Sequence, residues 1–326
     1  MCTALHFGEG RGLFGRTLDL ERSYGERTVF LPRNYEYRFL YEENERTHPA
    51  ILGTAYVYEG VPLFFDAQNE AGVAAAGLNF PGYAVYGPAT EGKINLASFE
   101  VIPWVLCNST SVRQAAELLK KANITSDSVS NEFPHTPLHW MIADKKESFV
   151  AESTAKGFRI YENPVGVMTN APLFPYHVAR LREYSSLSPY TPENRLCPDI
   201  EIKDIPRGTG AMGLPGDWSS SSRFIRAVFA KNHTAPSDSE GGAVSDFFHI
   251  ADSISLPCGC IRAGDGSPVK TVYTSCFDLL RGKYYYTTYE NRRIRSVSFG
   301  DLDIGSDKLV SFPMDGGEDV KYYNNR

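Results

Sequence analysis

The 326-residue sequence has no long apolar run, no regular Gly or Pro period and no excess of positive charge. A membrane-spanning helix needs about 18 to 20 apolar residues, and no window approaches that length. The 28 Gly and 20 Pro are scattered, which excludes a collagen-like repeat. A net charge of −6 argues against a nucleic-acid partner, because such binding depends on clustered Lys and Arg. We therefore expect a globular protein with neither a membrane nor a nucleic-acid partner.

The six cysteines form neither a dense disulfide framework nor a paired CxxC zinc pattern. The chain opens without the basic region and apolar stretch of a secretion signal. Free thiols and a cytoplasmic location are the resulting expectations. The cysteines are Cys2, Cys107, Cys197, Cys258, Cys260 and Cys276.

Several catalytic and cofactor motifs are also missing: the sequence has no P-loop, no GxGxxG that opens a helix, no HExxH and no GxSxG elbow. His135 and His139 have helical spacing, but Pro134 and Pro137 are incompatible with the regular helix that would present a metal. We expect neither a metal nor a cofactor.

Hydrophobic periodicity predicts strands at both ends of the chain around a mixed middle, which favours one layered α+β domain over residues 1–326 whose terminal strands share a sheet. A capping box at Ser111 to Gln114 predicts a helix that ends near Asn123. The polar segment 231–242 is interpreted as a surface loop. Further helices are expected at 96–107 (bent at Pro103), 176–184, 222–230 and 245–254. Strands are expected at 4–7, 13–16, 28–31, 56–58, 63–66, 73–79, 139–143, 148–152, 158–162, 165–169, 272–275, 283–289 and 294–298.

Cys2 becomes the first residue if the initiator Met1 is removed. A terminal thiol can be activated by its own α-amine, whose pKa is ordinarily about 7.7 to 8.0, so it needs no catalytic histidine. Arg16 and Asp19 follow on the next expected strand. An Arg beside a thiolate stabilises it, and an Asp facing the terminal ammonium orients it. An ordinary surface ion pair is the alternative for these two residues.

Asn79 and Asn170 stand where expected strands pass into loops. An amide or backbone N–H held there can donate to the oxyanion of an acyl-transfer intermediate, although Asn before a turn is also a common turn former. Arg223 interrupts an otherwise apolar helix face, and a buried guanidinium requires a partner. These three residues are the remaining candidates for a catalytic site.

Eight segments in order make the sequence resemble the choloylglycine hydrolase family, which includes bile salt hydrolases and penicillin V acylases among the N-terminal nucleophile hydrolases. The resemblance covers almost the whole chain. Its segments are Cys2, FGRTLD at 14–19, PRNY at 32–35, AGLNFPGYA at 76–84, LHWMIAD at 138–144, MTNAP from 168, GDWSSSSRF at 216–224, and YTSCFDL with YYYTTYENR near the end.

The resemblance implies a four-layer αββα sandwich of two antiparallel sheets, usually assembled as a homotetramer. It implies Cys2 as nucleophile, Arg16 at the sulfur, Asp19 at the amine, Asn79 and Asn170 as oxyanion donors, and Arg223 beneath them.

Bile salt hydrolases of this kind carry Asn at position 79, where penicillin V acylases tend to carry Tyr. A conjugated bile acid is therefore the expected substrate, and a penicillin V or other acyl-amide acylase, or a non-catalytic bile-acid-binding homologue, are the alternatives. A steroid needs an apolar cleft. Candidate substrate-binding residues are Leu18, Tyr58, Phe65, Val129 and Phe133.

Overall fold

The computed structural model describes residues 1–131, 134–203 and 205–324, and its first strand shares one antiparallel sheet with the strands predicted at 272–275, 283–289 and 294–298, as the sequence predicts. The order is β12-β1-β2-β14-β15-β16, with β13 paired to β14. The strands are β1 (Cys2–Phe7), β2 (Leu13–Leu20), β12 (Val167–Met168), β13 (Ile261–Arg262), β14 (Pro268–Asp278), β15 (Lys283–Thr288) and β16 (Arg295–Ser298).

An eight-stranded antiparallel sheet packs against the first, in the order β11-β10-β9-β6-β5-β4-β3-β17. Its strands are β3 (Arg27–Leu31), β4 (Ile51–Tyr58), β5 (Val61–Asn69), β6 (Ala74–Asn79), β9 (Leu138–Ala143), β10 (Ser148–Thr154), β11 (Gly157–Glu162) and β17 (Val310–Pro313). A separate parallel pair joins β7 (Ile94–Ala97) to β8 (Ala122–Thr125).

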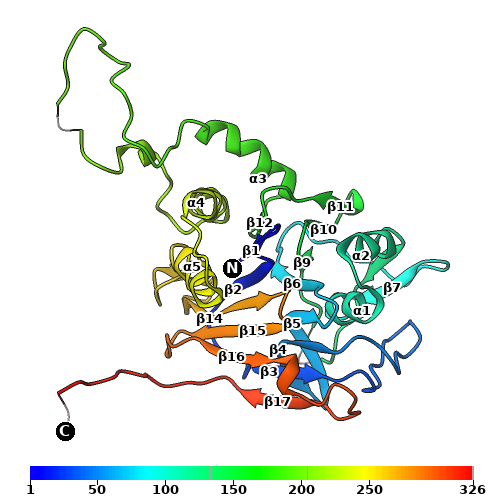
Figure 1. The fold of residues 1–326 in the computed structure, drawn as a ribbon. Helices are drawn as coiled ribbons and strands as arrows, with labels where there is room; N and C mark the ends of the chain where they lie inside the picture. The colour runs from blue at the N-terminus through cyan, green and yellow to red at the C-terminus, as the bar shows by residue number, and fades with distance from the viewer. Residues whose placement is uncertain (132–133, 204, 325–326) are drawn as a thin grey trace.

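Helices cover the outer face of each sheet, which gives four layers (Figure 1). The first pair, α1 (Val101–Asn108) and α2 (Val112–Leu119), packs on the eight-stranded sheet, and α4 (Ser220–His233) and α5 (Glu240–Asp252) pack on the seven-stranded sheet. The αββα prediction is confirmed. The remaining helices are α3 (Phe174–Arg180) and 3₁₀ turns at Leu181–Tyr184, Thr209–Ala211 and Phe299–Asp301.

Close packing of β2 against β14 depends on Gly15. A Cβ at this position would lie 2.0 Å from the Ser275 carbonyl oxygen, so any larger residue would push the strands apart. Glycine is tolerated in a strand where another backbone comes this near. The strand that carries Arg16 is thereby held in place.

Several predicted element boundaries are wrong, among them the following three. The predicted helix at 96–107 begins only at Val101, because 94–97 is strand β7; Pro103 lies in the first helical turn, where proline is tolerated, and the helix is not interrupted there. The helix after Ser111 ends at Leu119 rather than near Asn123. The predicted loop 231–242 is confined to 234–239, because α4 runs to His233 and α5 begins at Glu240, where Ser239 caps it by accepting from the Gly242 N–H at 3.1 Å.

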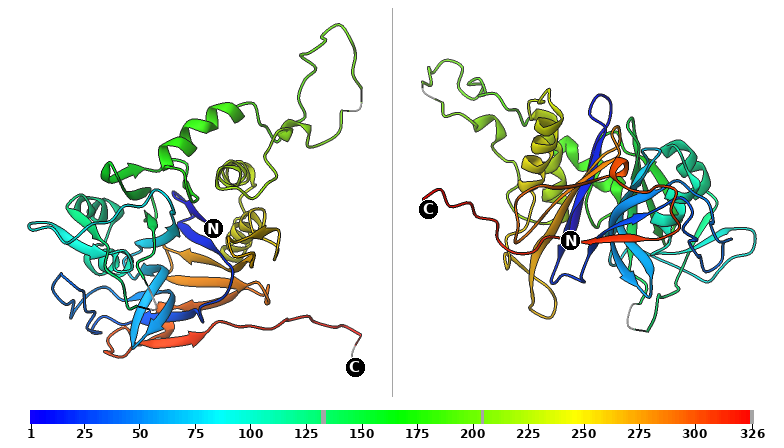
Figure 2. Two further views of the ribbon diagram at one scale, coloured as in Figure 1. Left: turned by 180° about the vertical axis from the view of Figure 1, so that it is seen from behind. Right: turned by 60° about the horizontal axis from the view of Figure 1, so that its bottom comes forward.

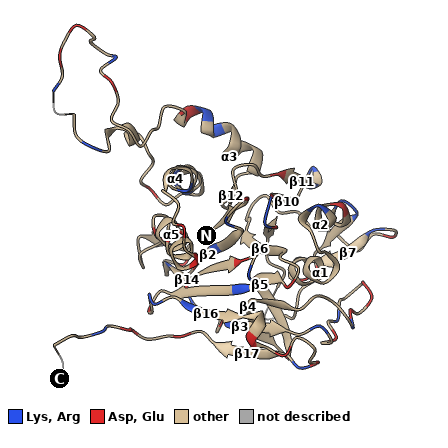
Figure 3. Cartoon of the chain, viewed as in Figure 1, with Lys and Arg blue, Asp and Glu red and all other residues tan. Residues whose placement is uncertain are grey.

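Two segments stand away from the layers, a green arm between α3 and α4 and the red C-terminal end (Figure 2). Charged residues of both signs are distributed over the outer loops and helices (Figure 3). Within the described ranges, no helix has the length and apolar character that crossing a membrane requires.

Candidate active site

Cys2 begins β1, where its partner in register is Leu18 of β2. Met1 continues the pairing: its terminal amine donates to the Asp19 carbonyl oxygen at 2.6 Å, and the Asp19 N–H donates to the Met1 carbonyl at 2.9 Å. Cys2 is only 2% exposed. The thiol is therefore held in the inner region of the molecule by the strand that carries it.

Arg16 lies two residues before Leu18 on β2, so its side chain shares the face of the Cys2 side chain. Its Nη2 donates to the Cys2 sulfur at 2.5 Å, and its Nη1 donates to the Gly77 carbonyl at 2.6 Å. Burial opposes the charged form, but Cys2 and other buried negative groups outweigh it and raise the pKa of Arg16. A permanent positive charge thus lies against the sulfur.

Asp19 projects to the opposite, helix-covered face of the same sheet because side chains alternate along a strand. It is completely buried, and it accepts from the Thr271 hydroxyl at 2.7 Å and the Thr17 hydroxyl at 3.3 Å. Burial raises the pKa of Asp19, although Arg223 and the N-terminal amine act in the other direction. Asp19 is thus a carboxylate beside the chain terminus whose charge depends on its immediate partners.

Asn170, Arg223 and Asn79 form one hydrogen-bond network around the Cys2 backbone. The Asn170 Oδ1 accepts from the Cys2 N–H and from Arg223 Nη2, both at 2.7 Å, while its Nδ2 donates to the Asn79 carbonyl at 2.7 Å. Arg223 Nη1 also donates to the Cys2 carbonyl at 2.6 Å. Burial lowers the pKa of Arg223, and the charges of Asp19 and Cys2 oppose that shift. Asn79 and Asn170 therefore meet although 91 positions separate them.

The structure brings the six predicted catalytic positions into one cluster. The five predicted substrate-binding positions differ in their burial and in their distance from it. Leu18 is buried beside Cys2, and the Phe65 carbonyl accepts from Arg16 Nη1 at 3.3 Å. Tyr58 is half-buried at the end of β4, and Val129 is half-buried in the segment after β8. Phe133 lies outside the described residues.

Sequence reasoning missed four buried residues that support this cluster. Asp66 lies 3.9 Å from Arg16 Nε, and Thr17 and Thr271 bond Asp19. His177 Nε2 donates to the Asn170 carbonyl at 3.0 Å, and burial lowers the pKa of His177 to about 4. Only Thr17 could have been found from the sequence, because it stands between Arg16 and Asp19. The other three lie far from Cys2 in sequence.

The family model described as linear amide C–N hydrolases, choloylglycine hydrolase family, matches residues 2–312. A bile salt hydrolase/transferase of Lactiplantibacillus plantarum is 42% identical over 99% of both chains. One of the same name from Clostridium perfringens is 36% identical over 99% of this chain and all of the other.

Two solved structures are similar as well. A mutant conjugated bile acid hydrolase from Clostridium perfringens has a TM-score of 0.91 at 35% identity, with 99% of this chain and all of the other covered. A penicillin V acylase from Agrobacterium tumefaciens, with a TM-score of 0.76 at 20% identity over 99% and 94% of the chains, shares the fold.

Two antiparallel sheets between helical layers, with a cysteine on the first strand, define the N-terminal nucleophile hydrolase fold. The chain belongs to the choloylglycine hydrolase family, and it is an amidohydrolase that acts on linear amides.

Proposed function

We propose that this enzyme is a bile salt hydrolase, which cleaves the amide bond of glycine- or taurine-conjugated bile acids through Cys2. The contact of 2.5 Å between Arg16 Nη2 and the Cys2 sulfur carries the proposal, because it provides the positive charge that a thiolate nucleophile needs. The names of full-length relatives at 42% and 36% identity support the substrate class.

In the proposed reaction the Cys2 thiolate attacks the amide carbonyl and forms a tetrahedral oxyanion. One Nδ2 hydrogen of Asn170 already bonds Asn79, which leaves the second for the oxyanion, and Asn79 supplies a further donor at the end of β6. The intermediate collapses, the amine leaves with a proton from the α-ammonium, and a thioester remains. Water, deprotonated by the α-amine, then hydrolyses the thioester through a second oxyanion.

The mechanism requires removal of Met1. While Met1 is present, the Cys2 nitrogen is an amide that donates to Asn170 and has no basic lone pair. After removal, the same nitrogen is an amine between Asn170 and the Arg223 network, and Asp19 compensates its positive charge. Arg223 acts here as a positioning residue, because it holds both the Cys2 carbonyl and Asn170.

Glycine release from glycocholate tests the proposal. We expect turnover by the wild-type protein with an intact mass that lacks Met1, and loss of at least about 10³-fold with Cys2→Ala, since the nucleophile is gone. Cys276→Ala is the matched control, because this thiol is also buried in the same sheet. Equal glycine release by wild type and Cys2→Ala would exclude covalent catalysis by Cys2.

Substrate class is tested by comparing glycocholate, taurocholate and penicillin V on one preparation. The proposal predicts that a bile salt gives the highest kcat/KM. Dominant turnover of penicillin V would identify an acylase instead, and binding of bile salts without turnover of any substrate would identify a non-catalytic homologue.

We also propose a homotetramer in the cytoplasm. The arm between α3 and α4 supports the assembly, because it carries apolar side chains that the single chain leaves in water; Leu196 and Tyr190 are 91% and 77% exposed. Exposed apolar surface of this kind marks protein interfaces. Light scattering should give four times the mass of the chain, and Leu196→Glu with Tyr190→Glu should lower it; a monomeric wild type would contradict the assembly.

A further inference from the structure

Thr271, which lies on β14 far from Cys2 in sequence, bonds the Asp19 carboxylate directly. The two residues are opposite each other in the register of β14 and β2. The Thr271 hydroxyl donates to Asp19 Oδ1 at 2.7 Å. We propose that Thr271 is a positioning residue for the reaction, which fixes the Asp19 carboxylate beside the N-terminal amine from the face of the sheet opposite the substrate. The inference depends on the proposed role of Asp19.

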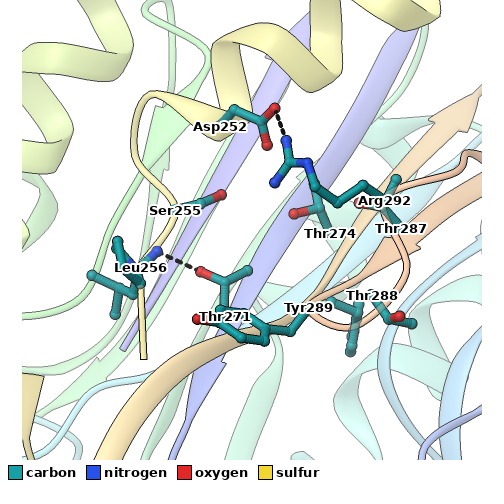
Figure 4. A pocket seen from close by; sticks show the side chains of 11 residues that line it. Asp252, Ser255, Leu256, Thr271, Thr274, Thr287, Thr288, Tyr289 and Arg292 are labelled. Carbon is teal, nitrogen blue, oxygen red and sulfur yellow. Dashed lines mark hydrogen bonds and ion pairs between the residues drawn. The ribbon is translucent and has the colours of Figure 1, made fainter. Parts of the chain in front are cut away.

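The direction of this hydrogen bond is set by the ionised carboxylate, and a second bond is compatible with it. The Leu256 N–H donates to the same Thr271 oxygen at 2.8 Å, which occupies a lone pair (Figure 4). A hydroxyl has one hydrogen, and a carboxylate can only accept. Thr271 must therefore direct its hydrogen to Asp19. The segment after α5 is coupled through this one side chain to the catalytic carboxylate.

The partners of Asp19 come from every surrounding element. Arg223 of α4, Arg16 of β2 and the N-terminal amine act on it electrostatically, and Thr17 and Thr271 donate to its two oxygens. Burial raises the pKa of Asp19, whereas the bond from Thr271 lowers it. A fully buried carboxylate needs such donors to stay ionised, and only the ionised form can compensate the α-ammonium.

Thr271 also borders a cavity of about 500 Å³ under the end of α5, where Arg292 bonds Asp252 at 2.5 Å (Figure 4). Thr271 is 6% exposed, while Asp19 behind it is completely buried. Thr271 thus lines this cavity and also bonds Asp19, which does not line it. Thr287 lines the same cavity without contacting Asp19 in the described structure, which makes it a matched control.

The decisive experiment compares Thr271→Val, Thr271→Ser and Thr287→Val in the wild-type background, with a bile salt that the wild type hydrolyses. We expect Thr271→Val to lower kcat about tenfold with an unchanged KM, because it acts away from the substrate. The acid limb of its kcat/KM profile should move up by about one pH unit, since a hydrogen bond to a charged group is lost. Thr271→Ser should restore both values, and Thr287→Val should match the wild type.

An unshifted pH profile in Thr271→Val would overturn the inference, whether kcat is normal or reduced, because a merely structural role lowers activity without moving the profile. Failure of serine to restore the profile would overturn it too. If valine prevents folding, Thr271→Ala provides the same comparison with serine. A wild type that hydrolyses no bile salt would instead contradict the proposed function.

Discussion

The two helical layers cover sheets of similar size but present different side chains to them. On the eight-stranded sheet, every residue of α1 from Val101 to Cys107 is buried, and none of them is charged. On the seven-stranded sheet, α4 buries Ser222 and Arg223 beside its apolar residues. Arg223 reaches through its layer to the backbone of Cys2.

The two layers therefore have different roles: α1 contributes packing, and α4 also contributes hydrogen bonds to the candidate site. An apolar layer stabilises the fold in proportion to the surface it removes from water. A buried guanidinium must be matched by acceptors, and here the acceptors belong to Cys2, Thr3, Asn170 and Trp218. Substitutions in α1 should thus change stability alone, whereas substitutions in α4 should change both stability and activity.

The largest effect is expected from Arg223→Met, which removes a donor from Asn170 Oδ1 and takes the Arg223 donor away from the buried Cys2 carbonyl. We expect kcat/KM to fall on the order of 10³-fold. Arg226→Met on the same helix is the control, since Arg226 bonds carbonyls outside the cluster, such as Ser253 at 2.9 Å. Steady-state kinetics on the folded variants measure the difference. Equal kcat/KM values for Arg223→Met and Arg226→Met would contradict a special role of Arg223 in the site.

A second pair of variants compares the layers directly. Leu106→Ala in α1 and Ile225→Ala in α4 both empty a buried site and should each lower the free energy of unfolding by about 3 kcal/mol. Only Ile225→Ala should also lower kcat, because Ile225 lies in the same buried cluster as Cys2, whereas Leu106 lies in the other cluster. Denaturant unfolding and kinetics on the same samples provide both values. A comparable loss of kcat in Leu106→Ala would mean that the α1 layer also supports the site.

The pH dependence of the free energy of unfolding should have opposite signs for a buried histidine in the seven-stranded sheet, His6, and a buried glutamate beside the eight-stranded sheet, Glu100. Burial lowers the pKa of His6 on β1 to about 4, so its contribution is present above pH 6.5 and is lost as the pH falls toward 4. Burial raises the pKa of Glu100, which precedes α1, to about 7, although N–H donors from Ala97 and Leu40 oppose it. The contribution of Glu100 is present below pH 4.5 and is lost as the pH rises through 7.

Unfolding free energies at pH 5 and pH 7 test these signs. His6→Gln should reduce the loss of stability on acidification, and Glu100→Gln should remove a loss on going to neutral pH, each on the order of 2 kcal/mol. Shifts of the same sign in the two variants would contradict the assignment.

The smallest effects should come from surface ion pairs, one beside each layer. Arg113 of α2 lies 2.6 Å from Glu147, and Arg292 lies 2.5 Å from Asp252 at the end of α5. Both arginines are mostly in solvent, so Arg113→Met and Arg292→Met should each change the free energy of unfolding by less than about 1 kcal/mol. A larger value for Arg292 alone would indicate that its cavity contributes to the stability of the sheet.

Local patterns predicted most of the elements, although they missed the short strands β7, β8, β13 and β17, and they predicted only part of the site. Cys2, Arg16 and Asp19 could be grouped because two short strands next to each other in sequence pair as β1 and β2. Asn170 and Arg223 each had an unusual local context, yet only the family resemblance related them to Cys2. Thr271 lies 252 positions from Asp19, and nothing in a single sequence reports the register of β14 on β2. The residues that support the site are therefore set by long-range strand pairing, which a single sequence does not reveal.

The pairing of Met1 with Asp19 has a consequence for how the enzyme is made. The bond to be cut between Met1 and Cys2 lies in an extended segment whose carbonyl and following N–H are both occupied, by Asp19 and Asn170. A peptidase needs a free, unpaired terminus in its own cleft. The proposed mechanism therefore predicts that the initiator leaves the nascent chain before β1 docks, and that a chain which folds first keeps Met1 and lacks the free amine of Cys2.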